Sequence, residues 1–192
     1  NDRVRVAIMG MNSRGHMLAT AMAPLKNCEI AYFCDVEENA LKKGMNKLSE
    51  VTDKKPKAIE DFREALDDKS IDALVIAAPD HWHAPATIMA CEAGKHVYVE
   101  KPCSHNPTEG EWMIEAARRY NRIVQMGTQR RSWPTAIKAM DELHSGRIGD
   151  VYFAKAWYAN SRGPIGTGRL TTPPANLNYE LWQGPAPRMP YQ

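Results

Sequence analysis

The sequence predicts an α/β fold, a doubly wound parallel sheet of the Rossmann type followed by only the start of a second, α+β domain. Short apolar runs alternate with helical stretches over residues 3–146. The runs are apolar throughout, which is typical of parallel strands covered by helices on both faces. After Gly149 this alternation ends. We therefore place a Rossmann domain at 1–149 and the beginning of the second domain at 150–192.

The expected strands are short apolar runs that end at a glycine, a proline or an acidic residue. The first run, VRVAIMG, ends at Gly10, and the clearest run, IDALVIAAP, ends at Pro79. In chain order, strands are expected at residues 4–10, 28–35, 57–59, 71–79, 95–100 and 122–127.

The expected helices have apolar residues at helical spacing and recognisable ends. Gly94 and Gly146 follow two of them, as C-terminal glycines commonly do. Thr108, with Glu111 three residues later, predicts a capping box at the start of another. In chain order, helices are expected at residues 13–22, 37–48, 61–66, 84–93, 108–120 and 134–144.

The last part of the chain differs from the rest in periodicity and composition. Residues 150–160 alternate with a period of two, which predicts a half-exposed strand of an antiparallel sheet. Residues 161–192 are rich in Gly, Pro, Asn and Thr and show no regular period. Because so long an irregular stretch is uncommon inside a compact domain, we interpret it as the start of a domain whose remainder is missing.

Composition narrows the classes of partner. The net charge is +2 and no block of Lys and Arg occurs, so no nucleic-acid partner is expected. No apolar run approaches the roughly 18 residues of a membrane span. The four cysteines lack metal-type spacing, and no metal is expected. We expect a cytoplasmic protein, or a bacterial periplasmic one if a signal peptide preceded Asn1.

A glycine-rich turn follows the first strand and opens the first helix, in the sequence Gly10-Met11-Asn12-Ser13-Arg14-Gly15. Gly10 permits the tight turn, and Gly15 lets the helix lie close to the strand. The helix N-terminus then offers N–H groups to a pyrophosphate. Asn12 takes the place of the usual middle glycine. We predict that Gly10, Asn12, Ser13, Arg14 and Gly15 bind a dinucleotide.

Asp35 closes the second strand, 20 residues after Gly15. A carboxylate at this position suits the hydroxyls of an adenosine ribose and repels a 2′-phosphate, so the predicted cofactor is NAD rather than NADP. The alternative is a purely structural strand-turn-helix unit that binds no ligand.

The segment after residue 77 carries small residues and two histidines, His81 and His83. Small residues would let a ribose or nicotinamide approach the backbone. A zinc site is disfavoured because no third and fourth ligand is suitably spaced. We expect His83 either to cap the next helix or to line the cofactor pocket. Trp82 either packs in the core or stacks on a ligand.

Glu100, Lys101 and Pro102 end a strand at the edge where parallel sheets bind ligands. A lysine near a cofactor can act as an acid or base, or can polarise a substrate hydroxyl. Glu100 would position Lys101 or reach the cofactor ribose, and the Lys101–Pro102 bond could be cis. The alternative for Lys101 is an ordinary solvated surface lysine.

A third polar cluster, at residues 127–131, follows the last strand of the sheet. Gln129 could contact nicotinamide or substrate, and Arg130 or Arg131 an acidic or hydroxylated substrate. The alternative is a solvated loop.

Together these residues resemble the Gfo/Idh/MocA oxidoreductases, which are related to glucose–fructose oxidoreductase and the inositol dehydrogenases. The resemblance rests on the glycine turn, Asp35, the stretch 71–102 with its Glu-Lys-Pro tripeptide, and GTQRRSWP at 127–134. WQGPAPRMPY at 182–191 is similar to a segment near the start of the substrate domain in some members.

The resemblance implies NAD(P)-dependent oxidation of a hydroxyl of a sugar, polyol or cyclitol, with hydride passing to the nicotinamide. It also implies that Lys101 contacts the reacting hydroxyl and is the catalytic residue. The residues that would hold or line the dinucleotide by this resemblance are Gly10, Asn12, Gly15, Asp35, Pro79, His83, Glu100 and Gln129.

One departure from the family pattern matters. Members carry an Asp and a His in an Asp-x-Gly-x-His-like motif, which is not found here and whose expected place lies beyond Gln192. We therefore expect the chain to bind NAD, to be inactive alone, and to form a homo-oligomer when full length. The alternatives are an NAD-dependent glycosidase, whose relatives tend to vary the Glu-Lys-Pro tripeptide, and a dinucleotide-binding protein without catalysis.

Overall fold

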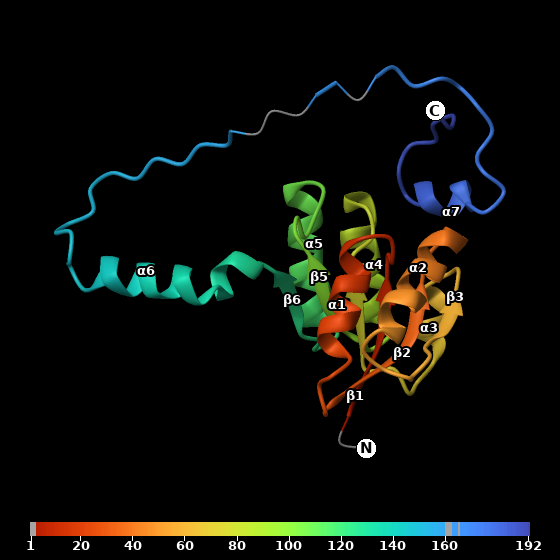
Figure 1. The fold of residues 1–192 in the computed structure, drawn as a ribbon, viewed down its shortest axis with the longest axis horizontal. Helices are drawn as coiled ribbons and strands as arrows, with labels where there is room; N and C mark the ends of the chain where they lie inside the picture. The colour runs from red at the N-terminus through yellow and green to blue at the C-terminus, as the bar shows by residue number, and fades with distance from the viewer. Residues whose placement is uncertain (1–2, 160–162, 165) are drawn as a thin grey trace. The chain divides into compact units, whose positions relative to one another are not determined.

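The structure is a computed structural model that describes residues 3–159, 163–164 and 166–192 (Figure 1). The chain forms two compact units. The first unit comprises residues up to Gly127 together with Thr171–Tyr191, and the second comprises Thr128–Leu170 with Gln192. The predicted domains 1–149 and 150–192 are a different division of the chain and stay a prediction.

The first unit is built on a six-stranded parallel sheet in the order β3-β2-β1-β4-β5-β6. The order reverses between β1 and β4, which makes this pair the topological switch point of the sheet. The six predicted strands are confirmed: the third has the predicted bounds, the fourth is reduced to four residues, and the others are one or two residues shorter than predicted. They are β1 (Val4–Met9), β2 (Cys28–Cys34), β3 (Lys57–Ile59), β4 (Ala73–Ile76), β5 (His96–Glu100) and β6 (Val124–Gly127).

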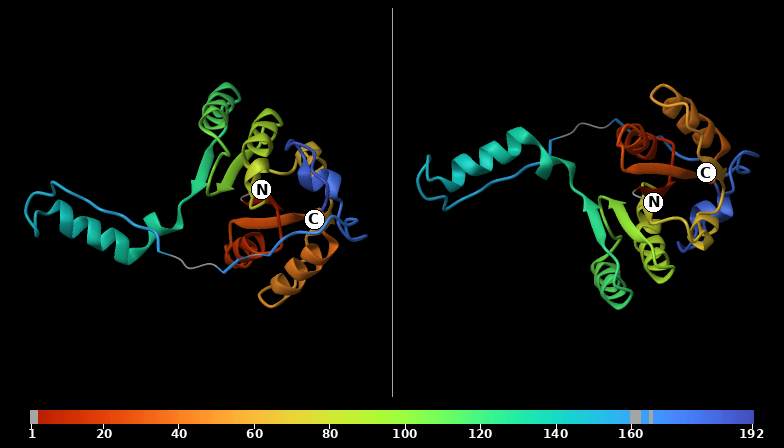
Figure 2. Two further views of the ribbon diagram at one scale, coloured as in Figure 1. Left: turned by 90° about the horizontal axis from the view of Figure 1, so that it is seen from above. Right: turned by 90° about the horizontal axis from the view of Figure 1, so that it is seen from below.

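Helices cover both faces of this sheet, as the apolar strands predict (Figure 2). Along β1, alternate side chains enter two separate cores, with Val6 and Ile8 on one face and Ala7 and Met9 on the other. The first core is closed by α1 (Arg14–Met22) and α2 (Glu38–Ser49). The second is closed by α3 (Arg63–Asp67), α4 (Asp80–Glu92) and α5 (Pro107–Arg119).

The prediction for the start of α4 was wrong by four residues. The helix begins at Asp80, directly after Pro79, whose extended backbone occupies the N-cap position. Asp80 supplies a negative charge to the first turn, where it is favourable. His83 therefore lies inside the helix and does not cap it.

The cap of α5 also differs from the prediction. Asn106, not Thr108, is the N-cap residue, and its Oδ1 accepts a hydrogen bond from the Glu109 N–H at 3.0 Å. The Glu109 carboxylate accepts in return from the N–H of His105 at 2.8 Å. The capping box is thus displaced by two residues, because Pro107 is suited to the first helical position and Asn106 to the position before it.

In the second unit, a short 3₁₀ turn, η1 (Gln129–Ser132), precedes α6 (Pro134–His144). The predicted strand at 150–160 is absent over 150–159, and residue 160 lies outside the described residues. A strand is stable only when a neighbour pairs with it, and within the described part of the chain this segment has no such neighbour.

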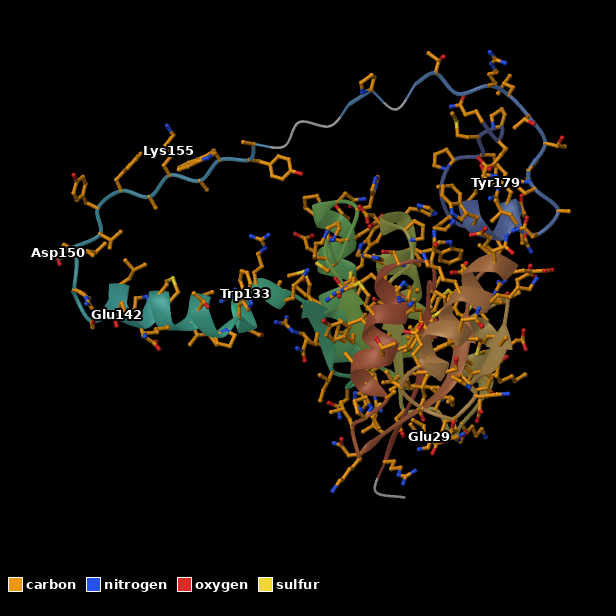
Figure 3. The ribbon with its side chains drawn as sticks, viewed as in Figure 1. Glu29, Trp133, Glu142, Asp150, Lys155 and Tyr179 are labelled. Carbon is orange, nitrogen blue, oxygen red and sulfur yellow. The ribbon has the colours of Figure 1, made fainter. Side chains whose placement is uncertain are left out.

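Residues 171–191 return to the first unit, which the sequence did not predict. They contain a short helix, α7 (Tyr179–Gln183), in a region expected to be irregular. We call residues 174–184 the strap. In Figure 3, Tyr179 of the strap lies at the opposite end of the sheet from Glu29 at the start of β2.

A search of the described residues finds no helix with the length and apolar character needed to cross a membrane.

The cap of α5 can be tested by two matched substitutions. Asn106→Ala should lower the free energy of unfolding by about 1 kcal/mol, because it leaves an amide at the helix start without its acceptor. Thr108→Ala should change it by less than about 0.5 kcal/mol, since Thr108 lies inside the helix. Urea unfolding of both variants measures the difference, and an equal cost for the two would refute the assignment of the cap.

Candidate functional site

Most of the predicted site residues meet at one edge of the sheet, beyond the carboxyl ends of β1, β2, β4 and β5. They belong to the first unit and are Gly10, Asn12, Ser13, Arg14, Gly15, Asp35, Pro79, His83, Glu100 and Lys101. Gln129 is exposed in η1 of the second unit, so its role at this edge stays a prediction.

The glycine turn is held by contacts that exclude a side chain. Gly10 has φ +89°, and a Cβ at this residue would lie 2.6 Å from the carbonyl carbon and oxygen of Ala77. A Cβ at Gly15 would overlap the carbonyl oxygen of Gly10. The start of α1 is therefore pressed against the turn after β1, and that turn against the end of β4, with backbone atoms at the contact.

The N-terminus of α1 is suited to an anion. Its N-cap residue, Ser13, makes no side-chain capping bond, and the first turn has no acidic residue. Asn12 and Ser13 are exposed. The first N–H groups of a helix lack intrahelical acceptors and carry partial positive charge. The geometry thus fits a pyrophosphate at this end of the helix.

A lysine that the sequence analysis missed adds positive charge to the turn. The Nζ of Lys43, on α2, donates to the Oδ1 of Asn12 at 3.2 Å. The contact is possible because α2 packs closely here, with Gly44 buried against the side chain of Met11. The only hint in the sequence is the glycine within a helical stretch, which can mark close packing.

Asp35 lies directly after β2 and has a second, structural role. Its Oδ2 accepts a hydrogen bond from the N–H of Met11 at 2.6 Å, and its Oδ1 accepts from the N–H of Glu37 at 3.0 Å. Burial raises the pKa of the carboxyl, and the bonds from Met11 and Glu37 oppose that rise. Since each carboxylate oxygen can accept a further bond, Asp35 can still receive two ribose hydroxyls.

Glu100 is paired with the glycine turn instead of with Lys101. Its Oε1 accepts a hydrogen bond from the Nε of Arg14 at 2.8 Å, with the Glu100 side chain 6% exposed and that of Arg14 33% exposed. A Cβ at Gly127 would meet Tyr98 Oη at 2.5 Å and Glu100 Oε1 at 3.0 Å, so that glycine leaves space for both. Burial and the Glu100 charge raise the pKa of Tyr98.

His83 is only 2% exposed and is bound at both ring nitrogens. Nδ1 contacts the carbonyl oxygen of Pro102, and Nε2 contacts that of Ala78 at 2.8 Å. The ring therefore ties the Lys101–Pro102 segment to the connection between β4 and α4. This position suits a residue that positions Lys101 better than one that contacts a ligand.

Two lysines flank β5 in contrasting environments. Lys101 is exposed at the carboxyl end, and its bond to Pro102 is cis, as the sequence suggested. Lys95 is buried at the other end, where its Nζ donates to the carbonyl oxygens of Asp68 and Ile71. Burial lowers the pKa of Lys95. Of the two, only Lys101 lies at the edge that carries the glycine turn.

The other predicted residues after β4 serve packing. Trp82 is buried and meets Phe62 edge to face, with ring centroids 5.5 Å apart. The Nε2 of His81 lies 2.8 Å from the carbonyl oxygen of Trp182. Among the described residues, no three His, Cys, Asp or Glu side chains converge as metal ligands.

Comparison with known proteins supports a dinucleotide site. The model of the Gfo/Idh/MocA family, described as an oxidoreductase family with an NAD-binding Rossmann fold, matches residues 4–128. That range contains every predicted site residue except Gln129.

Curated relatives that are identical to this chain at about a quarter of the aligned residues are named as glycosidases. Glycosyl hydrolase family 109 protein 1 of Akkermansia muciniphila is 26% identical over 181 residues, covering 89% of this chain and 38% of the relative. The α-N-acetylgalactosaminidase of Shewanella oneidensis is 26% identical over 161 residues, covering 81% of this chain and 35% of the relative. The chain thus spans less than half the length of these relatives.

Solved structures with a similar fold include inositol dehydrogenases. The myo-inositol 2-dehydrogenase of Lactobacillus plantarum has a TM-score of 0.69 and 26% identity, covering 78% of this chain and 43% of that one. The scyllo-inositol dehydrogenase of Lactobacillus casei, solved with NAD(H) and scyllo-inositol, has a TM-score of 0.69 and 25% identity, covering 77% and 43%.

The ion pair between Arg14 and Glu100 predicts that removing one partner costs more stability than removing the other. Arg14→Met should lower the free energy of unfolding by about 2 kcal/mol, because it leaves a buried carboxylate without its partner. Glu100→Gln should cost less, since water can solvate the one-third exposed guanidinium. The double variant should recover part of the loss. Chemical denaturation of the three variants gives the free energies for a double-mutant cycle. If the effects of the two single substitutions were additive, Arg14 and Glu100 would not be energetically coupled.

Proposed function

Because the chain belongs to the Gfo/Idh/MocA family of NAD-binding oxidoreductases, we propose that it binds NAD at the carboxyl edge of its sheet. The observation that carries the proposal is the hydrogen bond from the Met11 N–H to Asp35. It sets a carboxylate suited to ribose hydroxyls beside a helix N-terminus suited to a pyrophosphate. These two groups recognise the two parts of ADP that every dinucleotide of this class shares.

NAD is preferred to NADP in this proposal because of the charge on Asp35. A 2′-phosphate would meet the half-buried carboxylate at the position of the 2′-hydroxyl. Two negative charges at hydrogen-bonding distance repel strongly where little water screens them. Lys43 lies on the turn side, at Asn12, where it favours the pyrophosphate.

We propose that the complete protein oxidises a hydroxyl of a sugar, polyol or cyclitol. Bound NAD supplies the hydride acceptor at its nicotinamide. Lys101, held beyond β5 by Pro102 and His83, donates a hydrogen bond to the substrate oxygen and takes part in moving its proton. The chain spans less than half the length of its curated relatives, and we propose that the remaining length of such a protein supplies the substrate walls, the oligomer contacts and the rest of the catalytic group.

A second candidate function is glycoside cleavage that depends on NAD. It is favoured by the glycosidase names of the curated relatives. The Glu-Lys-Pro tripeptide at 100–102, on which the resemblance to the dehydrogenases of the family rests, favours the simple oxidoreductase. Release of a free sugar without net formation of NADH would select the glycosidase.

Cofactor preference gives a direct test by calorimetry. The protein should bind NAD more tightly than NADP. The Asp35→Ser variant should bind NAD about tenfold more weakly, and the difference between its affinities for NAD and NADP should be smaller. Asp61→Ser is a suitable control, because Asp61 follows β3 at the same edge but pairs with Arg63. Failure of the unaltered protein to bind either dinucleotide would refute the proposed function.

The role of Lys101 is testable in the complete protein. Lys101→Met should reduce kcat by a factor of about 10² to 10⁴, the usual loss when an acid or base is removed, and should leave NAD affinity nearly unchanged. Lys69→Met removes an exposed lysine away from the site and should have no effect. Steady-state turnover and NAD titration provide the measurements. Normal turnover of Lys101→Met would exclude a chemical role for this lysine.

A further inference from the structure

We propose that the strap, residues 174–184, forms a wall of the adenine part of the cofactor site. The proposal rests on the proposed function, because it names the part of NAD that the strap contacts. Its basis is the position of the strap in the first unit, where it joins the loop after β2 to the start of α4.

The first attachment is to the loop that follows Asp35. The N–H of Asn178 donates to the carbonyl oxygen of Val36 at 2.9 Å, and the N–H of Glu38 donates to that of Asn176 at 3.0 Å. Leu177 and Glu37 form an antiparallel bridge between these bonds. The strap is therefore hydrogen-bonded as a short extra strand to the residues that come directly after the ribose-binding carboxylate.

The second attachment is to the first turn of α4. The indole N–H of Trp82 donates to the carbonyl oxygen of Leu181 at 3.1 Å, and His81 Nε2 contacts that of Trp182 at 2.8 Å. Gly184 has φ +51°, and a Cβ there would overlap the Trp82 indole. Backbone atoms of the strap thus lie directly against a buried aromatic ring.

The chemistry of a dinucleotide places its base under this bridge. With the pyrophosphate at the start of α1 and the ribose at Asp35, the base leaves the ribose at C1′, away from the 5′-oxygen that carries the pyrophosphate. It therefore extends past Asp35 along Val36 and Glu37, where the strap is attached. A half-buried Leu177 and peptide groups suit a flat heteroaromatic ring with polar edges.

The test compares ligands that contain or lack the base. Gly184→Ala should displace the strap from Trp82 and weaken both NAD and ADP about tenfold, the loss of roughly one apolar side chain of contact. Binding of nicotinamide mononucleotide, which lacks adenosine, should not change. Gly94→Ala is the matched control, because Gly94 also follows a helix and has positive φ, but a Cβ added there would meet no atom within 4 Å.

Hydrogen exchange of the unaltered protein gives a second measurement that needs no variant. Saturating ADP should slow exchange in the peptide that contains Asn178 and Trp182, and nicotinamide mononucleotide should not. This measurement decides the question if Gly184→Ala does not fold. Unchanged exchange with ADP would overturn the proposal, and so would a folded Gly184→Ala variant that binds NAD and ADP as tightly as the unaltered protein does. Absence of NAD binding by the unaltered protein would instead defeat the proposed function itself.

Discussion

The close approach of backbone to backbone at Gly10 and Gly15 is the constraint on which the rest of the site depends. Neither position has room for a Cβ, so α1 can begin directly against the turn after β1, and that turn against the end of β4. This contact lies at the switch point of the sheet, where the strand order reverses. A side chain at either glycine would move the helix N-terminus away from the strand ends and open the anion site to water.

Two polar links extend from that turn in opposite directions across the sheet. On one side Met11 donates to Asp35 after β2, and on the other Arg14 pairs with Glu100 at the end of β5. Asp35, the proposed ribose ligand, and the Lys101 segment are therefore held by the same six-residue turn. His83 adds a third link, from the β4–α4 connection to the carbonyl of Pro102. The proposed adenosine-binding residue and the proposed proton-handling lysine are thus linked through one set of hydrogen bonds.

The sheet, its helices and the glycine turn could be predicted because their signals are local. Apolar runs identify the strands, and Gly10, Gly15 and Asp35 mark the turn by spacing alone. The partners of Arg14 and His83 could not be predicted, since each contact joins residues that are distant in sequence and chemically unremarkable. The α5 cap was misplaced because Asn106 and Thr108 are both good capping residues. The strand predicted at 150–160 is absent over 150–159. Alternation of apolar and polar residues indicates which side of a strand would be buried, but it does not show whether a second strand is present to pair with it.

The strap also shows that the first unit includes residues from far along the chain. The alternation of strand and helix patterns in the sequence ends at Gly149, yet the indole N–H of Trp82 donates to the carbonyl oxygens of Leu181 and Trp182. A chain ended at 149 would lack both acceptors and the packing of Leu181 against the core, and it would expose the Trp82 indole, which is only 9% exposed with the strap in place. Residues 171–191 of the segment rich in glycine and proline are therefore part of the folded unit that carries Asp35. Contacts in three dimensions and the pattern of the sequence thus divide the chain at different residues.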